Sequence, residues 1–354
     1  MNRQAVEAAL SSLLDPETGR TVVQMDQLHD VDVNGNKATV TLGLTTWAAP
    51  LWEETRAEAL RLLSDKLPVG TELAVRVVEH HRPPERIGQI GLSAKSVIAV
   101  GSGKGGVGKS TIAASIAYGL KNAGAAVGLM DADVYGPSVP HLLGVNERPT
   151  LVEGRLQPVT KDGLRVMSMG FLVPPGEAVV WRGPMLHGAI TQFLRDTEWG
   201  DLDYLVIDMP PGTGDIALTL SQLLPLSGAV VVCTPQDVAL LDAVKAIAMF
   251  RKVSIPLLGM VENMSYFLCP DNGKRYDIFG SGGAKRKAAE LAVPFLGEVP
   301  INIGIRERGD AGETRGNFDD ASTASYFQEI CLNLVRQLAS GHKASPPMPS
   351  LSVL

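Results

Sequence analysis

The sequence predicts an α/β protein in which a small α+β domain precedes a domain built on a mostly parallel sheet. From about residue 95 onward, short and nearly continuous apolar runs alternate with helical stretches, which is typical of a parallel sheet buried on both faces. A glycine-rich turn joins the first of these runs to the first helix of this region. Before residue 80 the pattern differs, because two strands follow each other directly around a short turn.

Residues 1–80 are expected to form the small α+β domain. An amphipathic helix over 6–14 is expected to end at Asp15 and Pro16, since proline cannot continue a helix. Apolar strands over 31–33 and 38–44 surround Asn34-Gly35-Asn36, which is a hairpin signal. A helix over 51–63 and a strand over 72–78 complete the order helix, strand, strand, helix, strand.

Residues 81–94 are expected to be a linker, because this stretch is polar and contains prolines. His80 and His81 lie next to each other where this stretch begins, and paired histidines can bind metal. Side chains of sequence neighbours point in different directions, so we expect solvated histidines here.

Residues 95–340 are expected to form the large domain. Strands are predicted over 97–100, 127–130, 166–168, 204–207, 229–233, 257–261 and 295–296, and helices over 184–194, 216–224 and 238–250. A last packing helix is expected over 320–339. The proline-bearing stretch 341–354 is expected to be a flexible tail.

The glycine-rich turn carries the pattern G-x-x-x-x-G-K-[ST] between a predicted strand and a predicted helix, which is a phosphate-binding loop. Its backbone N–H groups and the start of the helix favour phosphate oxygens. Lys109 is expected to reach the β- and γ-phosphates, and the Ser110 hydroxyl is expected to bind Mg²⁺. The predicted nucleotide-binding residues are Gly103, Lys104, Gly105, Gly106, Val107, Gly108, Lys109, Ser110 and Thr111.

Aspartates end two of the predicted strands, where ligands of a parallel sheet bind. Asp208 ends an apolar strand and is expected to hold Mg²⁺ directly or through water, as a Walker B carboxylate does. Asp131 and Asp133 follow another strand. One can support the waters of the metal, and the other can orient or deprotonate the attacking water.

Lys104 is a second lysine inside the phosphate loop, five residues before Lys109. Lys109 already serves the phosphates of its own loop. Lys104 can instead reach the nucleotide of a second subunit and stabilise the transition state in trans. This hypothesis predicts a nucleotide-dependent homodimer.

The loop from Lys104 to Ser110 resembles the deviant Walker A motif of the MinD, ArsA and nitrogenase iron protein class of P-loop NTPases. Three further stretches, 131–138, 208–215 and 261–265, together resemble the Mrp/ApbC family of iron–sulfur cluster carrier ATPases. The first domain resembles the small iron–sulfur-assembly domain of many bacterial members, on the stretches 15–19 and 44–46. The resemblance covers nearly the whole chain.

The resemblance implies an ATP-hydrolysing dimeric carrier that transfers iron–sulfur clusters to apoproteins and works with iron–sulfur assembly factors. It implies that ATP and Mg²⁺ are bound and that Lys104 is the signature lysine. Asp133 would orient the water, and Asn263 with the region of Pro235 and Asp237 would contact the adenine.

The sequence departs from the family at the cluster ligands. Members that carry a cluster have Cys-x-x-Cys after the Asn-Met-Ser segment, whereas here Cys269 is followed by Asn272 at the second position. Two thiolates per dimer do not make the usual four-cysteine ligation. Cys269 is thus a possible cluster ligand, with Asp271 as a possible oxygen donor. The alternative is a cluster-free ATP-dependent switch or assembly adaptor of the same fold.

Composition excludes several classes of function. The chain has 354 residues and a net charge of −6 without a basic run, which disfavours nucleic-acid binding. No apolar stretch is long enough for a membrane span, and the prolines from 346 to 349 interrupt any membrane-binding helix of the MinD kind. Three cysteines make no disulfide framework, and Cys233 and Cys331 are expected to be buried. The expected location is the cytoplasm.

Overall fold

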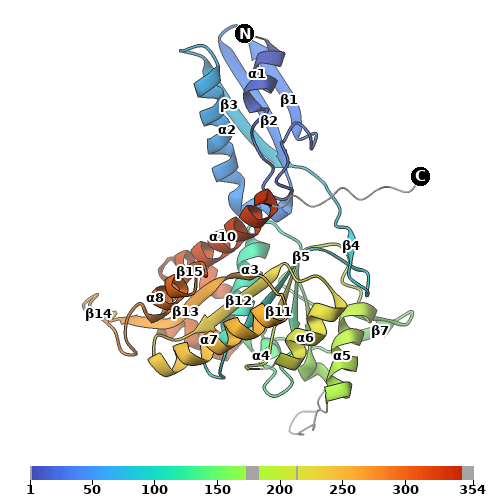
Figure 1. Ribbon diagram of the computed structural model, residues 1–354, viewed down its shortest axis with the longest axis vertical. Helices are drawn as coiled ribbons and strands as arrows, with labels where there is room; N and C mark the ends of the chain where they lie inside the picture. Colours follow the sequence, from blue (N-terminus) through green and yellow to red (C-terminus); the bar gives the residue numbers. More distant parts are fainter. Residues whose placement is uncertain (1, 173–182, 213, 345–354) are drawn as a thin grey trace. The chain divides into compact units, whose positions relative to one another are not determined.

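The computed structural model describes residues 2–172, 183–212 and 214–344, and the chain divides into two compact units (Figure 1). The small unit is Met1–Pro83 together with Val335–Leu354, and the large unit is Pro84–Leu334. The boundaries differ from those expected from the sequence, because the end of the chain groups with its beginning.

The small unit has the order helix, strand, strand, helix, strand that the sequence predicts. Its elements are α1 (Arg3–Leu10), β1 (Leu28–Asn34), β2 (Lys37–Leu44), η1 (Thr46–Leu51), α2 (Trp52–Lys66) and β3 (Glu72–Glu79). Strand β2 lies between the other two, antiparallel to β1 and parallel to β3. The side chains of Val6, Leu10, Val40, Leu42 and Leu63 are buried in its core.

Helix α1 ends at Leu10 rather than at residue 14. Residues 13–15 pair instead with residues 20–22: the Val22 N–H donates to the Leu13 carbonyl, and the Asp15 N–H donates to the Arg20 carbonyl. These bonds commit the N–H group of Asp15 to residue 20 instead of to the preceding helical turn, so the helix does not continue. The segment before Pro16 is therefore a loop.

Helix α10 (Ala321–Ala344) is longer than the predicted helix over 320–339, and it includes the first four residues of the predicted tail. Its last turns belong to the small unit. Leu338 and Ala339 are buried there, and the His342 ring stacks on Trp47 with ring centroids 5.3 Å apart. This tertiary packing stabilises the helix past residue 340, where the sequence pattern predicted a tail.

The large unit contains the mostly parallel sheet that the sequence predicts. The order along the sheet is β14-β13-β12-β5-β11-β6-β10-β9, with β15 also pairing with β13 and β4 with β5. All pairings among β13, β12, β5, β11, β6 and β10, and that of β15 with β13, are parallel. The strands are β4 (Arg86–Ile87), β5 (Leu92–Gly101), β6 (Val127–Asp131), β9 (Val159–Lys161), β10 (Leu164–Ser168), β11 (Leu202–Asp208), β12 (Gly228–Cys233), β13 (Leu257–Leu268), β14 (Arg275–Tyr276) and β15 (Phe295–Ile301).

Helices of the large unit cover the sheet, and α5, α6 and α7 lie side by side (Figure 1). The remaining elements are α3 (Lys109–Asn122), α4 (Val139–Leu143), η2 (Met169–Leu172), α5 (Gly183–Asp196), α6 (Gly214–Leu223), α7 (Asp237–Lys252), α8 (Gly283–Glu290), α9 (Ile303–Ala311), η3 (Thr314–Phe318) and the hairpin of β7 (Thr150–Val152) and β8 (Arg155–Gln157). Among the described residues, no helix combines the length and the apolar character needed to cross a membrane.

The expected linker over 81–94 is partly structured. Strand β4 and the first three residues of β5 lie inside it, and Leu92 and Ala94 are buried. Strand β4 is only two residues long, and it lies among polar residues and prolines. The sequence pattern therefore gives no signal for it. Strand β5 lies between β11 and β12 and leads into the phosphate loop, so the loop opens at the centre of the sheet.

Candidate nucleotide site

The phosphate loop leaves β5 and enters α3 through two glycines in the left-handed region. Gly106 has φ +77° and Gly108 has φ +79°, a conformation that residues with a side chain rarely adopt. A Cβ at Gly108 would also lie 2.1 Å from Nδ2 of Asn263. Asn263 therefore approaches the loop closely, and its Nδ2 donates to the Val107 carbonyl at 2.9 Å.

The three predicted aspartates meet beside the loop. Asp208 pairs in register with Asp131 on β6 and with Val100 on β5, because β11 lies between these two parallel strands. The ammonium of Lys109 lies 2.5 Å from Oδ1 of Asp208 and 3.7 Å from Oδ2 of Asp133. The structure thus brings the predicted lysine and all three carboxylates together.

Asp131 and Asp133 also fix the backbone that follows β6. Asp131 accepts hydrogen bonds from the N–H groups of Asp133 and Val139 and from the Ser168 hydroxyl, at 3.0, 3.2 and 3.0 Å. Asp133 accepts from the N–H groups of Tyr135 and Gly136 at 3.1 and 3.2 Å. Asp131 thus holds the backbone after β6 in place, whereas the second carboxylate oxygen of Asp133 is directed toward Lys109.

Burial disfavours the charged forms of the carboxylates in this cluster. Burial and the neighbouring Asp208 carboxylate raise the pKa of Asp131 to about 7. Burial also raises the pKa of Asp208, against the opposing effect of Lys109. The Lys109 ammonium pairs with two of the three carboxylates, those of Asp208 and Asp133, so a further cation would favour the ionised forms of the cluster.

The residues fit a magnesium ion. Asp208 is fully buried, and its Oδ2 has no hydrogen-bond partner within the described residues. Its other carboxylate oxygen contacts Lys109, whose ammonium is 3.2 Å from the Ser110 hydroxyl. Buried, unpartnered polar atoms are costly, and Mg²⁺ prefers such hard oxygen ligands.

Lys104 differs from Lys109. It is half-buried, and within the described ranges its ammonium forms no ion pair. Only its carbonyl is held, by a hydrogen bond from the Ser102 hydroxyl at 2.9 Å. A cation without a partner next to a phosphate loop remains available for a ligand or a second subunit.

A cavity of about 480 Å³ opens beside the phosphate loop. Gly108, Thr111 and Asn263 line it on the loop side, and Phe279, Ile305 and Phe327 are among its apolar lining residues. A mainly apolar pocket with a few polar groups is typical of a site for a small organic ligand. Asn263, for which the resemblance implies a contact with adenine, lines this cavity, and that contact stays a prediction; the lining residues of β15 and α9 had no signal in the sequence.

Pro235 and Asp237 do not line this cavity. Pro235 is buried between β12 and α7, and its carbonyl lies close to the backbone of Gly283. Asp237 is exposed in the first turn of α7. Their predicted contact with adenine stays a prediction.

Cys269 lies in the turn between β13 and β14. Its N–H donates to the Lys274 carbonyl at 3.0 Å, and its carbonyl accepts from the Gly273 N–H at 2.8 Å. Asn272 uses its Oδ1 to accept from the Lys274 N–H at 2.9 Å. The side chain at the second position of the motif thus closes the turn, while the Cys269 thiol is half-buried and free.

The other two thiols are buried, as predicted. Burial raises the pKa values of Cys233 and Cys331 to about 12, which keeps both protonated at neutral pH. The three cysteines are all free.

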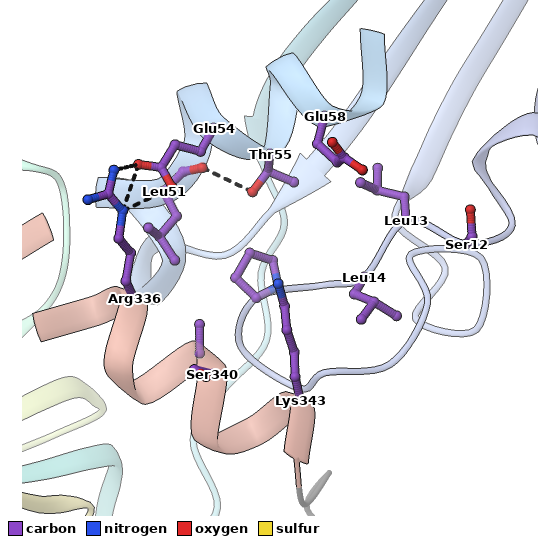
Figure 2. Close-up of a pocket in the computed structure, with 12 residues that line it drawn as sticks. Ser12, Leu13, Leu14, Leu51, Glu54, Thr55, Glu58, Arg336, Ser340 and Lys343 are labelled. Carbon is purple, nitrogen blue, oxygen red and sulfur yellow. Dashed lines mark hydrogen bonds and ion pairs between the residues drawn. The ribbon is translucent and has the colours of Figure 1, made fainter. Parts of the chain in front are cut away.

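The small unit has a cavity of its own, of about 500 Å³, that no sequence pattern indicated. Figure 2 shows Glu54 and Glu58 of α2 facing Arg336 and Lys343 of α10 across it. Arg336 and Glu54 form an ion pair, and both are about half exposed. Residues more than 280 positions apart meet here, so the sequence gives no local signal for it.

Comparison with known proteins places these features in context. The profile of the NUBPL iron-transfer P-loop NTPases matches residues 93–335, and that of the iron–sulfur cluster assembly protein domain matches residues 3–77. Two similar relatives are called iron–sulfur cluster carrier proteins. The one from Synechocystis sp. is 46% identical and covers 88% of this chain and 90% of its own length, and the one from Deinococcus radiodurans is 47% identical, with 87% of each covered.

Solved structures give the same fold. A nucleotide-binding protein from Archaeoglobus fulgidus in complex with ADP is 41% identical, has a TM-score of 0.56, and covers 63% of this chain and 88% of its own. The cell division ATPase MinD from Pyrococcus furiosus is 22% identical with a TM-score of 0.51, and covers 67% of this chain and 97% of its own. The second likeness concerns the fold alone.

Proposed function

Because the chain belongs to the family of NUBPL-type iron-transfer P-loop NTPases, we propose that it is an ATP-hydrolysing dimeric carrier that binds iron–sulfur clusters and transfers them to apoproteins. The observation that carries the proposal is that strand β13 reaches from the phosphate loop to Cys269. Its residue Asn263 bonds the phosphate loop, and the strand ends one residue before Cys269. Strand β13, which has an irregularity between Asn263 and Phe267, thus links the nucleotide site to the only accessible thiol of the described chain.

In the proposed reaction, water attacks the γ-phosphate of ATP and the products are ADP and phosphate. The loop backbone and Lys109 bind the β- and γ-phosphates, while Asp133 orients the attacking water. Ser110 and Asp208 would hold Mg²⁺, with Asp131 supporting its waters. When bound, the ion neutralises charge on the phosphates as the bond to the leaving oxygen breaks.

The nucleoside is assigned to the cavity beside the loop, with Asn263 among its contacts. The ADP bound to the Archaeoglobus fulgidus relative supports an adenine nucleotide as the ligand class. Thr111 lines the same cavity and directly follows Ser110, so phosphate and nucleoside sites are adjacent. Pro235 and Asp237 remain proposed adenine contacts.

The active form is proposed to be a homodimer. The ammonium of Lys104, which forms no ion pair among the described residues, would contact the phosphates of the second subunit's nucleotide, where it would stabilise charge in the transition state. Lys109 cannot do this for the partner because its own carboxylates hold it. ATP binding would bring the subunits together, and hydrolysis would separate them.

The cargo is proposed to bind at the turn that bears Cys269. Two copies of Cys269 would supply two thiolates, and the exposed Asp271 could supply oxygen ligands. This ligand set is weaker than four thiolates, which suits transient binding of a cluster that is passed on. The clients would be apoproteins, with assembly factors as donors and the cytoplasm as the location.

One observation favours the alternative, a cluster-free switch or assembly adaptor. The side-chain oxygen of Asn272 accepts a hydrogen bond from the backbone of its own turn, and the other two free cysteines, Cys233 and Cys331, are buried. In that case the nucleotide cycle would control partner binding alone, and the small unit would be the adaptor.

Anaerobic reconstitution with ferrous iron and sulfide separates these two functions. The carrier predicts iron and sulfide retained after desalting, with the absorption of an iron–sulfur cluster, in the wild type but not in Cys269→Ala. Asp271→Ala is the companion variant. If it retains an amount of iron between those of the wild type and Cys269→Ala, Asp271 supplies an oxygen ligand to the cluster. Equal iron in the wild type and Cys269→Ala would leave only the switch.

A further inference from the structure

Strand β13 carries a bulge between the nucleoside cavity and the Cys269 turn. Its regular pairing with β15 stops after Asn263 and resumes at Phe267, and the three residues in between are matched by a single residue of β15, Pro300. The bulge consists of Met264, Ser265 and Tyr266. Proline has no backbone N–H and donates no hydrogen bond to a neighbouring strand. The bulge therefore relies on other contacts to hold its conformation.

Met264 gives the bulge a strained backbone and a contact with the cavity. Its φ is +55°, in the left-handed region, which a residue with a side chain adopts only at a cost in free energy. Such a conformation persists only where its surroundings hold it. The Met264 side chain lines the cavity beside the phosphate loop, and its Cε would lie 3.9 Å from a Cβ at Gly108. A nucleoside in that cavity would therefore contact the strained residue itself.

A buried hydroxyl of the bulge lies between two carboxylates. Ser265 is fully buried, and its Oγ is 2.6 Å from Oε1 of Glu262 and 3.0 Å from Oε2 of Glu298. Glu262 is also fully buried, and its Oε2 accepts from the Ala284 N–H in the first turn of α8 at 2.6 Å. A hydroxyl has one proton and donates it to one acceptor at a time. Ser265 therefore has two alternative acceptors, one on β13 itself and one on β15.

Arg275 of β14 connects these contacts to the Cys269 turn. It pairs with Leu268, the residue before Cys269, across the turn. Its Nη1 lies 3.6 Å from Oε1 of Glu298. Its guanidinium carbon lies 3.9 Å from the centroid of the Tyr266 ring, which is a cation–π contact. One side chain thus contacts both the bulge and β15, and it lies opposite the strand end that leads to the thiol.

We propose that Arg275 positions the Cys269 turn and that the bulge links it to the nucleoside cavity, so that nucleotide binding changes the exposure of the Cys269 thiol. A ligand shifts such an equilibrium only if it contacts the two states differently, and contact with Met264 supplies this difference. Movement of the bulge would change the acceptor of Ser265 and with it the distance between Glu298 and Arg275. The inference rests on the proposed nucleotide site, but not on cluster binding or on hydrolysis.

The labelling rate of the Cys269 thiol with a thiol reagent, measured with and without saturating ADP, tests the role of Arg275. Cys269→Ala reports the background from the two buried thiols. ADP should change the rate in the wild type by about fivefold or more, the lower end of couplings between sites. In Arg275→Ala the rate without ADP should rise about fivefold, since a cation–π contact and an ion pair no longer hold β14, and ADP should not change it.

Asp277→Ala is the matched control for Arg275→Ala. It removes another ion pair of Arg275, which has an Nε–Oδ1 distance of 2.8 Å, and it leaves the contacts with Tyr266 and Glu298 in place. Its labelling rates with and without ADP should therefore equal those of the wild type. Circular dichroism reports whether each variant is folded.

Met264→Gly tests the bulge. Glycine adopts the left-handed conformation without cost and has no side chain to contact the nucleoside, so the ADP-dependent change should disappear at an ADP concentration that titration shows to be saturating. An ADP-dependent change as large in Arg275→Ala and Met264→Gly as in the wild type would overturn the inference. An unchanged rate in a wild type that binds ADP would overturn it as well. Failure of the wild type to bind ADP, which the titration reports separately, would remove the proposed nucleotide site and this inference with it.

Discussion

The nucleotide site and the Cys269 turn are built on opposite principles. The first gathers Lys109, Asp131 and Asp208 at the carboxyl ends of three neighbouring parallel strands, where each side chain is buried and held by others. The second is a turn beyond the end of β13, in which one half-buried thiol depends on local backbone bonds. A buried site tolerates little change, whereas a turn can lose a ligand without loss of the fold.

The largest effect is expected from Lys109→Ala, which should reduce both nucleotide binding and ATP turnover below detection. The variant removes the proposed phosphate ligand and also the cation that, among the described residues, forms the ion pairs with Asp208 and Asp133. Phosphate release and nucleotide titration measure it, and circular dichroism reports whether the chain is folded. Lys252→Ala, in the exposed last turn of α7, is the matched control and should behave as the wild type.

Lys104→Ala should spare nucleotide affinity within about threefold and lower turnover by about 10³-fold, as expected for a cation supplied in trans. The unpaired state of its ammonium in the described chain is the reason that little else should change. Mixing the variant with an equal amount of Lys109→Ala chains sharpens the test. Each mixed dimer has one intact Lys104 opposite one intact Lys109 loop, so partial recovery of turnover is expected. No recovery, or full activity of Lys104→Ala alone, would contradict action across an interface.

The cysteine turn should gain function by a single change. Asn272→Cys would give the dimer four thiolates, and reconstitution should then retain about four iron atoms per dimer, as a four-cysteine cluster requires. Asn272→Ala is the control, because it loses the same bond to the Lys274 N–H without adding a thiol. If both variants retain the same iron, the turn does not position residue 272 toward a cluster. ATP turnover without client should stay unchanged in both.

The difference between the two regions also decides what the sequence could predict. Alternating apolar strands and helices imply a parallel sheet, and a parallel sheet places its strand ends together; this was enough to predict the meeting of Lys109, Asp131 and Asp208. The profile match confirms the family, and the sheet order confirms the fold class. The nucleotide roles of Pro235 and Asp237 remain predictions.

The small unit could not be predicted to the same extent, because its contacts link residues far apart in sequence. His80 was expected to be solvated, yet it bonds His29, 51 residues earlier. Arg82 was assigned to a linker, yet it lies 3.0 Å from both Asp15 and Glu17. The end of α10 packs with residues of the first domain, such as Trp47. Contacts between side chains of different loops follow no sequence periodicity, so the sequence pattern does not predict them.

The smallest effect is expected where the two regions join, at Asn263. Asn263→Ala removes the bond to the Val107 carbonyl and one lining side chain of the proposed nucleoside cavity. A lost hydrogen bond of this kind contributes about 1 kcal/mol, so nucleotide affinity should fall by about fivefold to tenfold. Asn122→Ala, an exposed asparagine at the end of α3, should leave affinity unchanged. The rate at which a thiol reagent labels Cys269 completes the test: with saturating nucleotide, the wild type should change its labelling rate and Asn263→Ala should not. Equal nucleotide-dependent changes in both proteins would mean that the phosphate loop and the Cys269 turn communicate by another route than β13.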